Sequence, residues 1–270
     1  ERLIAQAEDM AEQGVKELIL VAQETTVYGK DLYGKKSLHI LLKKLCEIRG
    51  IRWIRILYCY PEEIYDELIE TIRDEKKICH YLDIPIQHAS DRILKRMGRR
   101  TSKQELIDIV GKLRKEIPDI VLRTTLITGF PGETEEDHEE LKEFVDEMEF
   151  DRLGVFTYSP EENTPAAEMA DQVPEEVKEE RRDELMELQQ EISYDRGQDR
   201  IGQELLVMIE GKVADESAYI GRTYGDAPKV DGYIFVQTGE LLMTGDFAKV
   251  RVTGALEYDL IGVLSDEYTE

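Results

Sequence analysis

The sequence predicts a parallel α/β domain followed by a small closed β-barrel, and three observations support this prediction. Apolar runs rich in β-branched residues alternate with amphipathic segments from the N-terminus to Ser159. A long charged segment begins at Pro174, and the chain beyond it carries short β-rich runs separated by turn residues. With 270 residues, the chain is long enough to form two domains.

The first domain is expected to contain five parallel strands. Its β-rich runs are "ELILVAQ" (17–23), "IRWIRILYCY" (51–60), "YLDIPIQ" (81–87), "DIVLRTTLITG" (119–129) and "RLGVFTYS" (152–159). Segments with apolar residues three or four positions apart lie between them, at 37–48, 62–75, 90–97, 103–116 and 134–148. Strand, helix and strand in this order form parallel strands with crossover helices, as in an open sheet or a partial (β/α) barrel.

The rest of the chain is expected to form a connecting helix and a second domain. The segment "PEEVKEERRDELMELQQEISYDRG" begins with a proline and ends near Gly197, which is typical of one long helix. Its apolar stripe is thin and consists of Val177, Leu185, Leu188 and Ile192. Five short β-rich runs follow, which favour a small antiparallel barrel of the OB-like size. We therefore expect domains at 1–173 and 200–270, joined by a helix at 174–199.

Composition indicates a soluble, cytoplasmic protein. No apolar run approaches the roughly 18 residues that a membrane span needs. Cys46, Cys59 and Cys79 are too scattered for a disulfide framework or a close-spaced metal motif, which favours a reducing compartment. The chain lacks an initiator Met and opens inside a helical pattern, so it is expected to be a fragment of a longer protein.

The formal net charge is −24, and the acid is concentrated in the middle and C-terminal parts. Residues 1–132 contain 23 basic (Lys and Arg) and 21 acidic (Asp and Glu) side chains. Residues 133–191 contain 5 basic and 23 acidic side chains, and residues 192–270 contain 7 basic and 15 acidic ones. Such a field repels a polyanion and attracts a basic partner. A soluble surface of solvated helix faces is an alternative of about equal weight.

Polar residues follow each predicted strand, at the edge where parallel domains build their sites. These residues are Gln23 to Gly29, Tyr58 and Tyr60, Gln87 to Asp91, Thr125 and Thr128, and Tyr158 and Ser159. Hydroxyls and amides dominate, and the lone His88 is more often a structural group than a general base. No nucleophile elbow, HExxH motif or Walker lysine is present, which excludes the corresponding hydrolytic and nucleotide chemistries. Such an edge suits a polar, zwitterionic cofactor.

The turn "GFPGET" first suggests a phosphate loop, because it lies between a strand and a helix N-terminus. The acids at the start of the following helix already complement the helix dipole, so no phosphate is needed there. Gly129 and Gly132 permit the backbone to turn closely at the end of the strand, and Glu133 is expected to be a capping residue.

The strand ends, taken in order, closely resemble the methylthiotransferase branch of the radical S-adenosylmethionine (SAM) enzymes. The motifs are "GVKELILVAQETTVYGKDL", "RILYCYPEEI", "DIPIQHASDRILKRMGRR", "RTTLITGFPGETEEDHEEL" and "FTYSPEENTPAAEM". The resemblance covers nearly the whole chain. It implies a partial (β/α) barrel of the radical SAM type, followed by a TRAM domain, which is a small β-barrel. It also implies SAM and two 4Fe–4S clusters as cofactors.

Within that branch, several positions resemble the RimO type, which modifies an aspartate of a ribosomal protein, more than the MiaB type, which modifies a tRNA adenosine. Glu161 in "YSPEENTPAA" replaces a usual arginine of the tRNA enzymes, and "GRTYGDAPKVDGYIFV" contains Asp226 and Asp231 of the RimO-like pattern. A barrel that grips tRNA should be basic, yet residues 200–270 hold 6 basic and 13 acidic side chains. We therefore expect a basic small-subunit ribosomal protein as the partner.

The resemblance assigns candidate contacts by position. Residues matched to the cofactor site are Gln23, Glu24, Thr25, Gln87, Ser90, Arg123, Thr125 and Gly129. Residues matched to the substrate side are Glu161, Asp226 and Asp231. For Arg123, an ion pair with a neighbouring helix is an equally weighted alternative. A flavodoxin or ferredoxin is the implied electron donor.

The sequence departs from the family at the cluster. The C-x-x-x-C-x-x-C loop is absent, and Cys46, Cys59 and Cys79 do not replace it, so the chain by itself is expected to be inactive. Two other interpretations stay open. A tRNA adenosine methylthiotransferase would keep the fold and cofactor but needs a basic TRAM surface, which this sequence lacks. A non-enzymatic ribosome-binding module of barrel plus TRAM is kept open by the missing cysteines.

Overall fold

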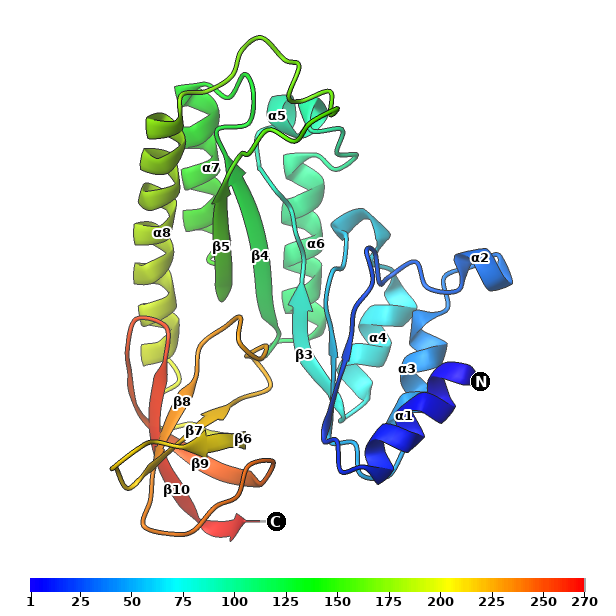
Figure 1. The fold of residues 1–270 in the computed structure, drawn as a ribbon, viewed down its shortest axis with the longest axis vertical. Helices are drawn as coiled ribbons and strands as arrows, with labels where there is room; N and C mark the ends of the chain where they lie inside the picture. The colour runs from blue at the N-terminus through cyan, green and yellow to red at the C-terminus, as the bar shows by residue number, and fades with distance from the viewer. Residues whose placement is uncertain (270) are drawn as a thin grey trace.

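The computed structural model describes residues 1–269 and contains two domains connected by a long helix (Figure 1). The elements of the first domain are α1 (Arg2–Glu12), β1 (Glu17–Leu20), α2 (Lys30–Tyr33), α3 (Leu38–Cys46), β2 (Trp53–Ile56), η1 (Pro61–Glu63), α4 (Asp66–Asp74), β3 (Ile78–Asp83), α5 (Asp91–Arg96), α6 (Lys103–Glu116), β4 (Val121–Thr128), α7 (Glu135–Met148) and β5 (Arg152–Thr157). The elements that follow are α8 (Glu175–Gln198), β6 (Glu204–Lys212), β7 (Ala218–Arg222), β8 (Ile234–Gln237), β9 (Phe247–Ala255) and β10 (Leu260–Thr269).

The first domain is a five-stranded sheet in the order β1-β2-β3-β4-β5, and every neighbouring pair is parallel. This confirms the predicted α/β class. Apolar side chains on the outer face of the strands, such as Ile54, Leu82 and Leu122, share one buried core with the helices. The second strand ends at Ile56, earlier than predicted, because the backbone turns into the left-handed region at Tyr58 (φ 58°).

Helix α8 packs along β5 and α7, on the left of Figure 1. Leu185 and Ile192 of the predicted stripe belong to the core of the first domain. Polar side chains fill the rest of this buried face, namely Lys178, Arg181, Gln189 and Ser193. Each of these forms hydrogen bonds within the domain, which makes their burial tolerable.

The C-terminal barrel is closed in the order β10-β8-β7-β6-β9. Its pairs are antiparallel except β10 with β8, which is parallel. Inward-facing aliphatic side chains fill it, including Val207, Ile234 and Val250. The predicted small barrel is therefore confirmed, with one parallel pair that the alternation pattern does not reveal.

The C-terminal barrel packs against the inner face of the sheet, which is the face opposite the helices. Trp53 of β2 and Phe247 of β9 meet edge to face with ring centroids 4.9 Å apart. Tyr81 and Val121 of the sheet share a buried cluster with Ala227, which lies in the loop between β7 and β8. The barrel thus closes the end of the sheet at which the strands begin. Among residues 1–269, no helix has the length and apolar character needed to cross a membrane.

Candidate cofactor site at the strand ends

The ends of β1 and β2 are tied together by Thr25. Its hydroxyl donates to the Leu57 carbonyl (2.6 Å) and its amide donates to the Tyr58 carbonyl (3.0 Å). The amide of Ala22 in turn donates to the Thr25 hydroxyl (3.2 Å). Thr25 is buried, so its role in this structure is to hold the two strand ends in register.

The Glu24 carboxylate also links neighbouring strand ends. Its oxygens accept hydrogen bonds from the amide (2.9 Å) and hydroxyl of Thr26 and from the amide of Tyr60 (2.9 Å). Burial raises the pKa of Glu24, and the hydrogen bonds from Thr26 and Tyr60 oppose that rise. Gln23, by contrast, is exposed at the edge. Of these three predicted cofactor contacts, two are engaged in positioning the edge.

Two non-glycine residues at this edge adopt left-handed backbone conformations. Tyr58 (φ 58°) is held by the Asp83 carboxylate, which accepts from its amide at 3.2 Å. Gln87 (φ 71°) is held by β4, since its amide donates to the Thr125 carbonyl (2.9 Å) and its carbonyl accepts from the Ile127 amide (2.8 Å). Such conformations cost about 1–3 kcal/mol and are found at ligand-binding edges.

Gln87 also carries a buried side-chain oxygen, Oε1, that has no hydrogen-bond partner among the described residues. A buried acceptor without a donor is costly, and a ligand that supplies the donor removes that cost. The amino group and ribose hydroxyls of SAM are such donors. The residues at this edge therefore fit the polar cofactor that the family resemblance implies.

Arg123 and Thr125 lie on the inner face of β4. The Arg123 Nη1 donates to Asp83 Oδ1 (2.7 Å) and to Thr125 Oγ1 (3.3 Å). Arg123 Nε lies 3.5 Å from Asp231 Oδ1. Burial alone would lower the pKa of Arg123, but Asp83, Tyr81 and Asp231 together raise it. Arg123 does form ion pairs, as the alternative interpretation expected. Its partners are Asp83 of β3 and Asp231 of the C-terminal barrel instead of a residue on a neighbouring helix.

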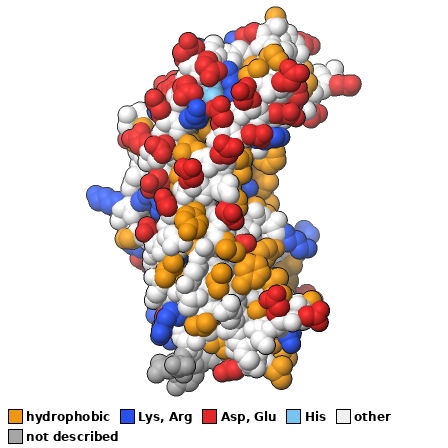
Figure 2. Space-filling view, turned by 90° about the vertical axis from the view of Figure 1, so that its left-hand side faces the viewer, with side chains coloured by type: hydrophobic (Ala, Val, Ile, Leu, Met, Phe, Trp, Pro, Cys, Tyr) orange, Lys and Arg blue, Asp and Glu red, His pale blue; other side chains and the backbone are white. Residues whose placement is uncertain are grey.

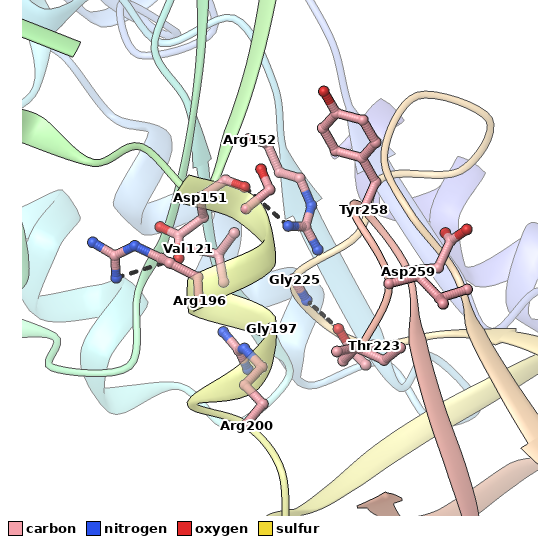
Figure 3. Close-up of a pocket in the computed structure, with 13 residues that line it drawn as sticks. Val121, Asp151, Arg152, Arg196, Gly197, Arg200, Thr223, Gly225, Tyr258 and Asp259 are labelled. Carbon is pink, nitrogen blue, oxygen red and sulfur yellow. Dashed lines mark hydrogen bonds and ion pairs between the residues drawn. The ribbon is translucent and has the colours of Figure 1, made fainter. Parts of the chain in front are cut away.

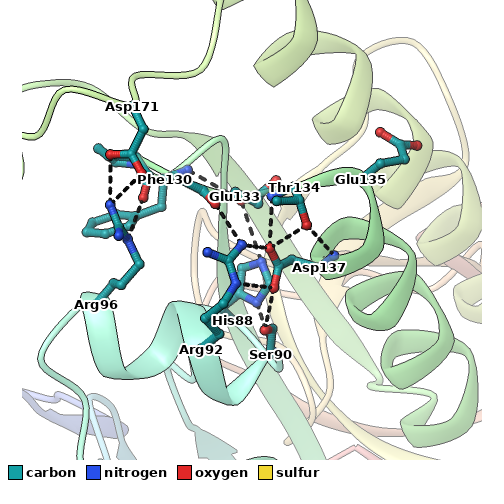
Figure 4. Close-up of polar contacts among 12 residues, drawn as sticks. His88, Ser90, Arg92, Arg96, Phe130, Glu133, Thr134, Glu135, Asp137 and Asp171 are labelled. Carbon is teal, nitrogen blue, oxygen red and sulfur yellow. Dashed lines mark hydrogen bonds and ion pairs between the residues drawn. The ribbon is translucent and has the colours of Figure 1, made fainter.

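His88 and Ser90 turn away from this edge toward α7 (Figure 4). The amide of Ser90 donates to His88 Nδ1 (2.9 Å), and the Ser90 hydroxyl donates to Asp137 Oδ1 (2.7 Å). His88 is fully buried and Ser90 nearly so. His88 therefore has the structural role that was favoured, whereas Ser90 is not brought together with the other predicted cofactor contacts.

The "GFPGET" turn contains its own anion. The Glu133 carboxylate accepts from the amides of Gly129 (2.8 Å) and Phe130 (3.3 Å) and pairs with Arg181 Nη1 (2.9 Å). The cap of α7 is instead Thr134, whose hydroxyl and backbone exchange hydrogen bonds with Asp137. The expectation that Glu133 caps the helix was wrong by one residue, and its carboxylate occupies the place of a phosphate.

Gly129 is not at the open edge. A Cβ on Gly129 would lie 2.1 Å from Cγ of Lys178, because α8 passes directly over the turn. Its left-handed backbone (φ 70°) and this close approach both require glycine. The structure thus places Gly129 under α8, away from the cofactor contacts predicted for it.

The three predicted substrate residues separate into two groups. Glu161 is exposed in the loop after β5. Asp226 is buried at the interface between the domains, and the side chain of Asp231 is only 3% exposed there. Asp226 Oδ1 accepts from Arg152 Nη2 (2.6 Å), and Asp231 Oδ2 accepts from the Tyr81 hydroxyl (2.7 Å). Figure 3 shows Arg152 in the small pocket where β5 meets the loop that carries Thr223 and Gly225. In this arrangement, both carboxylates join the domains and neither faces a partner.

Sequence reasoning missed three charged residues with structural roles. Asp83 holds Tyr58 and Arg123 at the strand ends, Arg152 pairs with Asp226 at the domain interface, and Arg181 pairs with Glu133 in the turn before α7. Each is a charged residue inside an otherwise apolar strand or helix face, as in "YLDIP" and "RLGVF". Charges are rarely buried unless paired, so a charge at an inward position is a signal that could have identified them.

The cysteines do not form a cluster site. Cys59 and Cys79 are fully buried, and burial raises the pKa of Cys79 to about 12, which disfavours the thiolate that iron requires. Within residues 1–269, no group of three or more His, Cys, Asp or Glu side chains is arranged to hold a metal ion. The residues present therefore fit SAM but not the iron–sulfur cluster.

Comparison with known proteins identifies the family. The model of the Radical SAM superfamily matches residues 1–145, and the TRAM domain model matches residues 201–264, which is the C-terminal barrel. The chain belongs to the radical SAM superfamily. The predicted partial barrel of the radical SAM type followed by a TRAM domain is thereby confirmed.

Two curated relatives of this radical SAM chain carry the same name. It is 67% identical over 262 residues to "Ribosomal protein uS12 methylthiotransferase RimO" of Lachnoclostridium phytofermentans, which covers 97% of this chain and 60% of the relative. The protein of the same name from Clostridium botulinum (strain Langeland) is 53% identical over 270 residues, covering 100% of this chain and 60% of the relative. The chain thus spans about 60% of the length of these relatives. The resemblance to the RimO type is confirmed.

A solved structure supports the fold of this radical SAM chain. Coproporphyrinogen III oxidase (HemN) from Escherichia coli, a radical SAM enzyme, superposes with a TM-score of 0.55 at 17% identity. The match covers 92% of this chain and 60% of that one.

Proposed function

We propose that this chain forms the SAM-binding edge and the TRAM domain of a methylthiotransferase that modifies ribosomal protein uS12, at the β-carbon of an aspartate. The 67% identity to a RimO enzyme, sustained over 97% of the chain, carries this proposal. The strand-end geometry is consistent with it, because Gln23, Gln87, Arg123 and Thr125 surround the edge at which parallel domains bind ligands.

When bound and reduced by an iron–sulfur cluster, SAM would supply the radical chemistry needed to remove a hydrogen atom from the substrate. This chain's own residues bind and orient the cofactor. Gln87 Oε1, which is buried without a partner among the described residues, would accept a hydrogen bond from it, and the Arg123 guanidinium would donate to one of its oxygens. Thr25 and Glu24 keep the neighbouring strand ends in place, so that a bound cofactor would be held in one orientation. The ligands of both proposed 4Fe–4S clusters lie outside these 270 residues, and a flavodoxin or ferredoxin is the proposed electron donor.

The proposed protein partner is basic. Figure 2 shows Asp and Glu side chains crowded over the upper half of the face formed by α7 and α8, whereas fewer appear over the C-terminal barrel below. In the barrel, Asp226 and Asp231 are buried and Glu210 is paired with Arg222 at 2.7 Å. The field that attracts a basic ribosomal protein is therefore proposed to be stronger over α7 and α8 than over the C-terminal barrel.

A mass measurement tests the reaction. The complete product of the gene, reconstituted anaerobically with iron and sulfide, is incubated with SAM, a reductant and uS12. We expect uS12 to gain the mass of a methylthio group less one hydrogen, and uS12 with its target aspartate replaced to gain nothing. Modification of bulk tRNA instead of uS12 would show that the tRNA alternative is correct.

A second measurement tests the assignment of the cluster. The 270-residue chain alone is reconstituted in the same way and analysed for iron and sulfide. We expect no stoichiometric cluster and no cleavage of SAM. A cluster that cleaves SAM in this chain would refute the assignment of its ligands to other residues.

A further inference from the structure

The C-terminal barrel covers the inner face of the five-stranded sheet at the end where the strands begin. The loop between β7 and β8 lies under the inner face of the sheet and meets charged side chains from several strands. Arg55 Nη1 donates to the Tyr224 carbonyl of this loop at 2.6 Å. Glu17 of β1 accepts from Arg222 at 2.6 Å, just before the loop begins. The loop is therefore held by contacts with β1 and β2 near one edge of the sheet and with β4 and β5 near the other, all on the inner face.

One carboxylate of this loop reaches a predicted cofactor contact. Asp231 Oδ2 accepts from the Tyr81 hydroxyl (2.7 Å) and from the amide of Ala227 (2.8 Å), which orient the group. Its other oxygen lies 3.5 Å from Nε of Arg123. The Asp231 side chain is 3% exposed, so water does not screen the interaction with Arg123 well.

Arg123 is held from two sides. Asp83 pairs with Nη1 at 2.7 Å and Asp231 approaches Nε, so the guanidinium is fixed between a strand carboxylate and a carboxylate of the C-terminal barrel. Its Nη2 would lie 3.8 Å from a Cβ at Gly154 on the neighbouring strand, so it extends over a position without a side chain. Arg123 is 17% exposed at its side chain, which leaves it accessible from the open inner side.

We propose that Asp231 is a positioning residue: from the C-terminal barrel, it fixes the Arg123 guanidinium in the orientation that meets SAM. This rests on the proposed function, in which Arg123 contacts the cofactor. The role assigned to Asp231 differs from the substrate contact predicted from sequence. It makes the TRAM domain a structural part of the cofactor site.

The test compares Asp231→Asn with Asp259→Asn. Asp259 also lies in the C-terminal barrel and accepts from the amide of Tyr233 (2.7 Å), but it makes no ion pair with the sheet among the described residues. Asn has the same shape as Asp, so the substitution removes the charge of Asp231 with little change in volume. Trp53 fluorescence, which reports contact with Phe247, checks that the domains remain docked.

Two readouts are needed. In the 270-residue chain, NMR of the arginine side chains measures proton exchange at Arg123 Nε, and we expect it to be about tenfold faster in Asp231→Asn and unchanged in Asp259→Asn. In the complete, cluster-loaded gene product, we expect the KM for SAM to rise about tenfold in Asp231→Asn with kcat changed less than about twofold. A factor of ten corresponds to about 1.4 kcal/mol, the size of one charged hydrogen bond.

The outcomes separate the two proposals. If the wild type modifies uS12 and Asp231→Asn keeps the wild-type KM, the positioning role is refuted and the function stands. If the wild type cleaves no SAM, the proposed function fails and this inference fails with it. If the Trp53 fluorescence shows that the domains of Asp231→Asn are no longer docked, Tyr81→Phe is used as the test variant instead. That change removes only the hydroxyl that orients Asp231. An unchanged KM in docked Tyr81→Phe would then refute the inference.

Discussion

At the scale of single residues, buried charges decide how the two domains meet. Arg152, Asp226, Arg123 and Asp231 pair across the interface, and none of the four side chains is more than 19% exposed. A buried ion pair adds little net stability over a pair of apolar side chains, but removing one partner leaves the other charge buried without a counter-charge. These residues therefore specify one relative placement of the domains.

Asp226→Asn should destabilise the chain by about 2 kcal/mol. This is less than the 3–5 kcal/mol of a fully buried pair, because the Arg152 side chain keeps partial contact with water. Urea unfolding at neutral pH measures the change. Asp215→Asn, an exposed position in the turn after β6, is the matched control and should differ from wild type by less than about 0.5 kcal/mol. Equal effects of the two substitutions would contradict the buried pair.

The same pair predicts a dependence on pH. Burial alone would raise the pKa of Asp226, but its ion pair with Arg152 and its bonds from Thr223 lower it. A lowered pKa means that the stabilisation is complete above about pH 4, the value of an unfolded aspartate, and is lost as pH falls through the folded-state value. The stability difference between wild type and Asp226→Asn should be constant from pH 7 to about 4.5 and shrink below it. A difference that grows toward acid pH would refute this assignment.

At the scale of elements, the turn between β4 and α7 is stabilised from inside. Glu133 satisfies two turn amides and pairs with Arg181 of α8, while Thr134 and Asp137 cap the helix. The turn thus joins β4, α7 and α8 at one buried point (Figure 4).

Glu133→Gln should cost about 3 kcal/mol in urea unfolding, because it removes the buried one of the two carboxylates that pair with Arg181. Glu135→Gln provides a control on the same arginine. Glu135 lies 3.2 Å from Arg181 Nη2, but its side chain is 70% exposed, so its loss should cost less than about 1 kcal/mol. If Glu135→Gln were the more damaging change, the internal anion would not be the group that stabilises the turn.

Gly129→Ala should destabilise by about 3 kcal/mol. A left-handed alanine costs about 1–2 kcal/mol, and displacement of Lys178 by the new Cβ adds about 1–3 kcal/mol. Gly98→Ala has a similar backbone (φ 74°) but nothing near the added Cβ, so it should show only the backbone part. The difference between the two variants isolates the packing of α8 on the turn, and a difference of zero would exclude that contact.

At the scale of the whole molecule, the acidic side chains are unevenly distributed between α8 and the C-terminal barrel. Neutralising Glu176, Glu180 and Glu187 on α8 should weaken binding of a basic ribosomal protein about tenfold at low salt, through slower association. The matched variant neutralises the exposed Glu216, Glu240 and Glu257 of the C-terminal barrel and should have the smaller effect. Binding titrations at two salt concentrations measure both effects. A larger effect from the variant of the C-terminal barrel would show that the barrel, as expected from the sequence, is the docking surface.

Much of this architecture follows from local sequence patterns. Alternating strands and helices predicted the parallel sheet, and short β-rich runs predicted the barrel, because both depend on periodicities of a few residues. The roles of Asp226 and Asp231 could not be predicted this way. Their partners Arg152 and Tyr81 lie 74 and 150 positions away, and an acidic residue looks the same in sequence whether it faces a partner or a buried arginine.

The contact between Glu17 and Arg222 has a consequence for biosynthesis. Its two residues are 205 positions apart, so Glu17 is translated long before its partner. At about 5–20 residues translated per second, the inner face of the sheet stays uncovered for roughly 10–40 s before the loop that packs on it has been made. During that interval, Arg55 and Tyr81 lie on an open, partly apolar surface while the chain is still attached to the ribosome. Slow translation of the last strands would lengthen the exposure, and newly made chains would then need chaperones most at this stage.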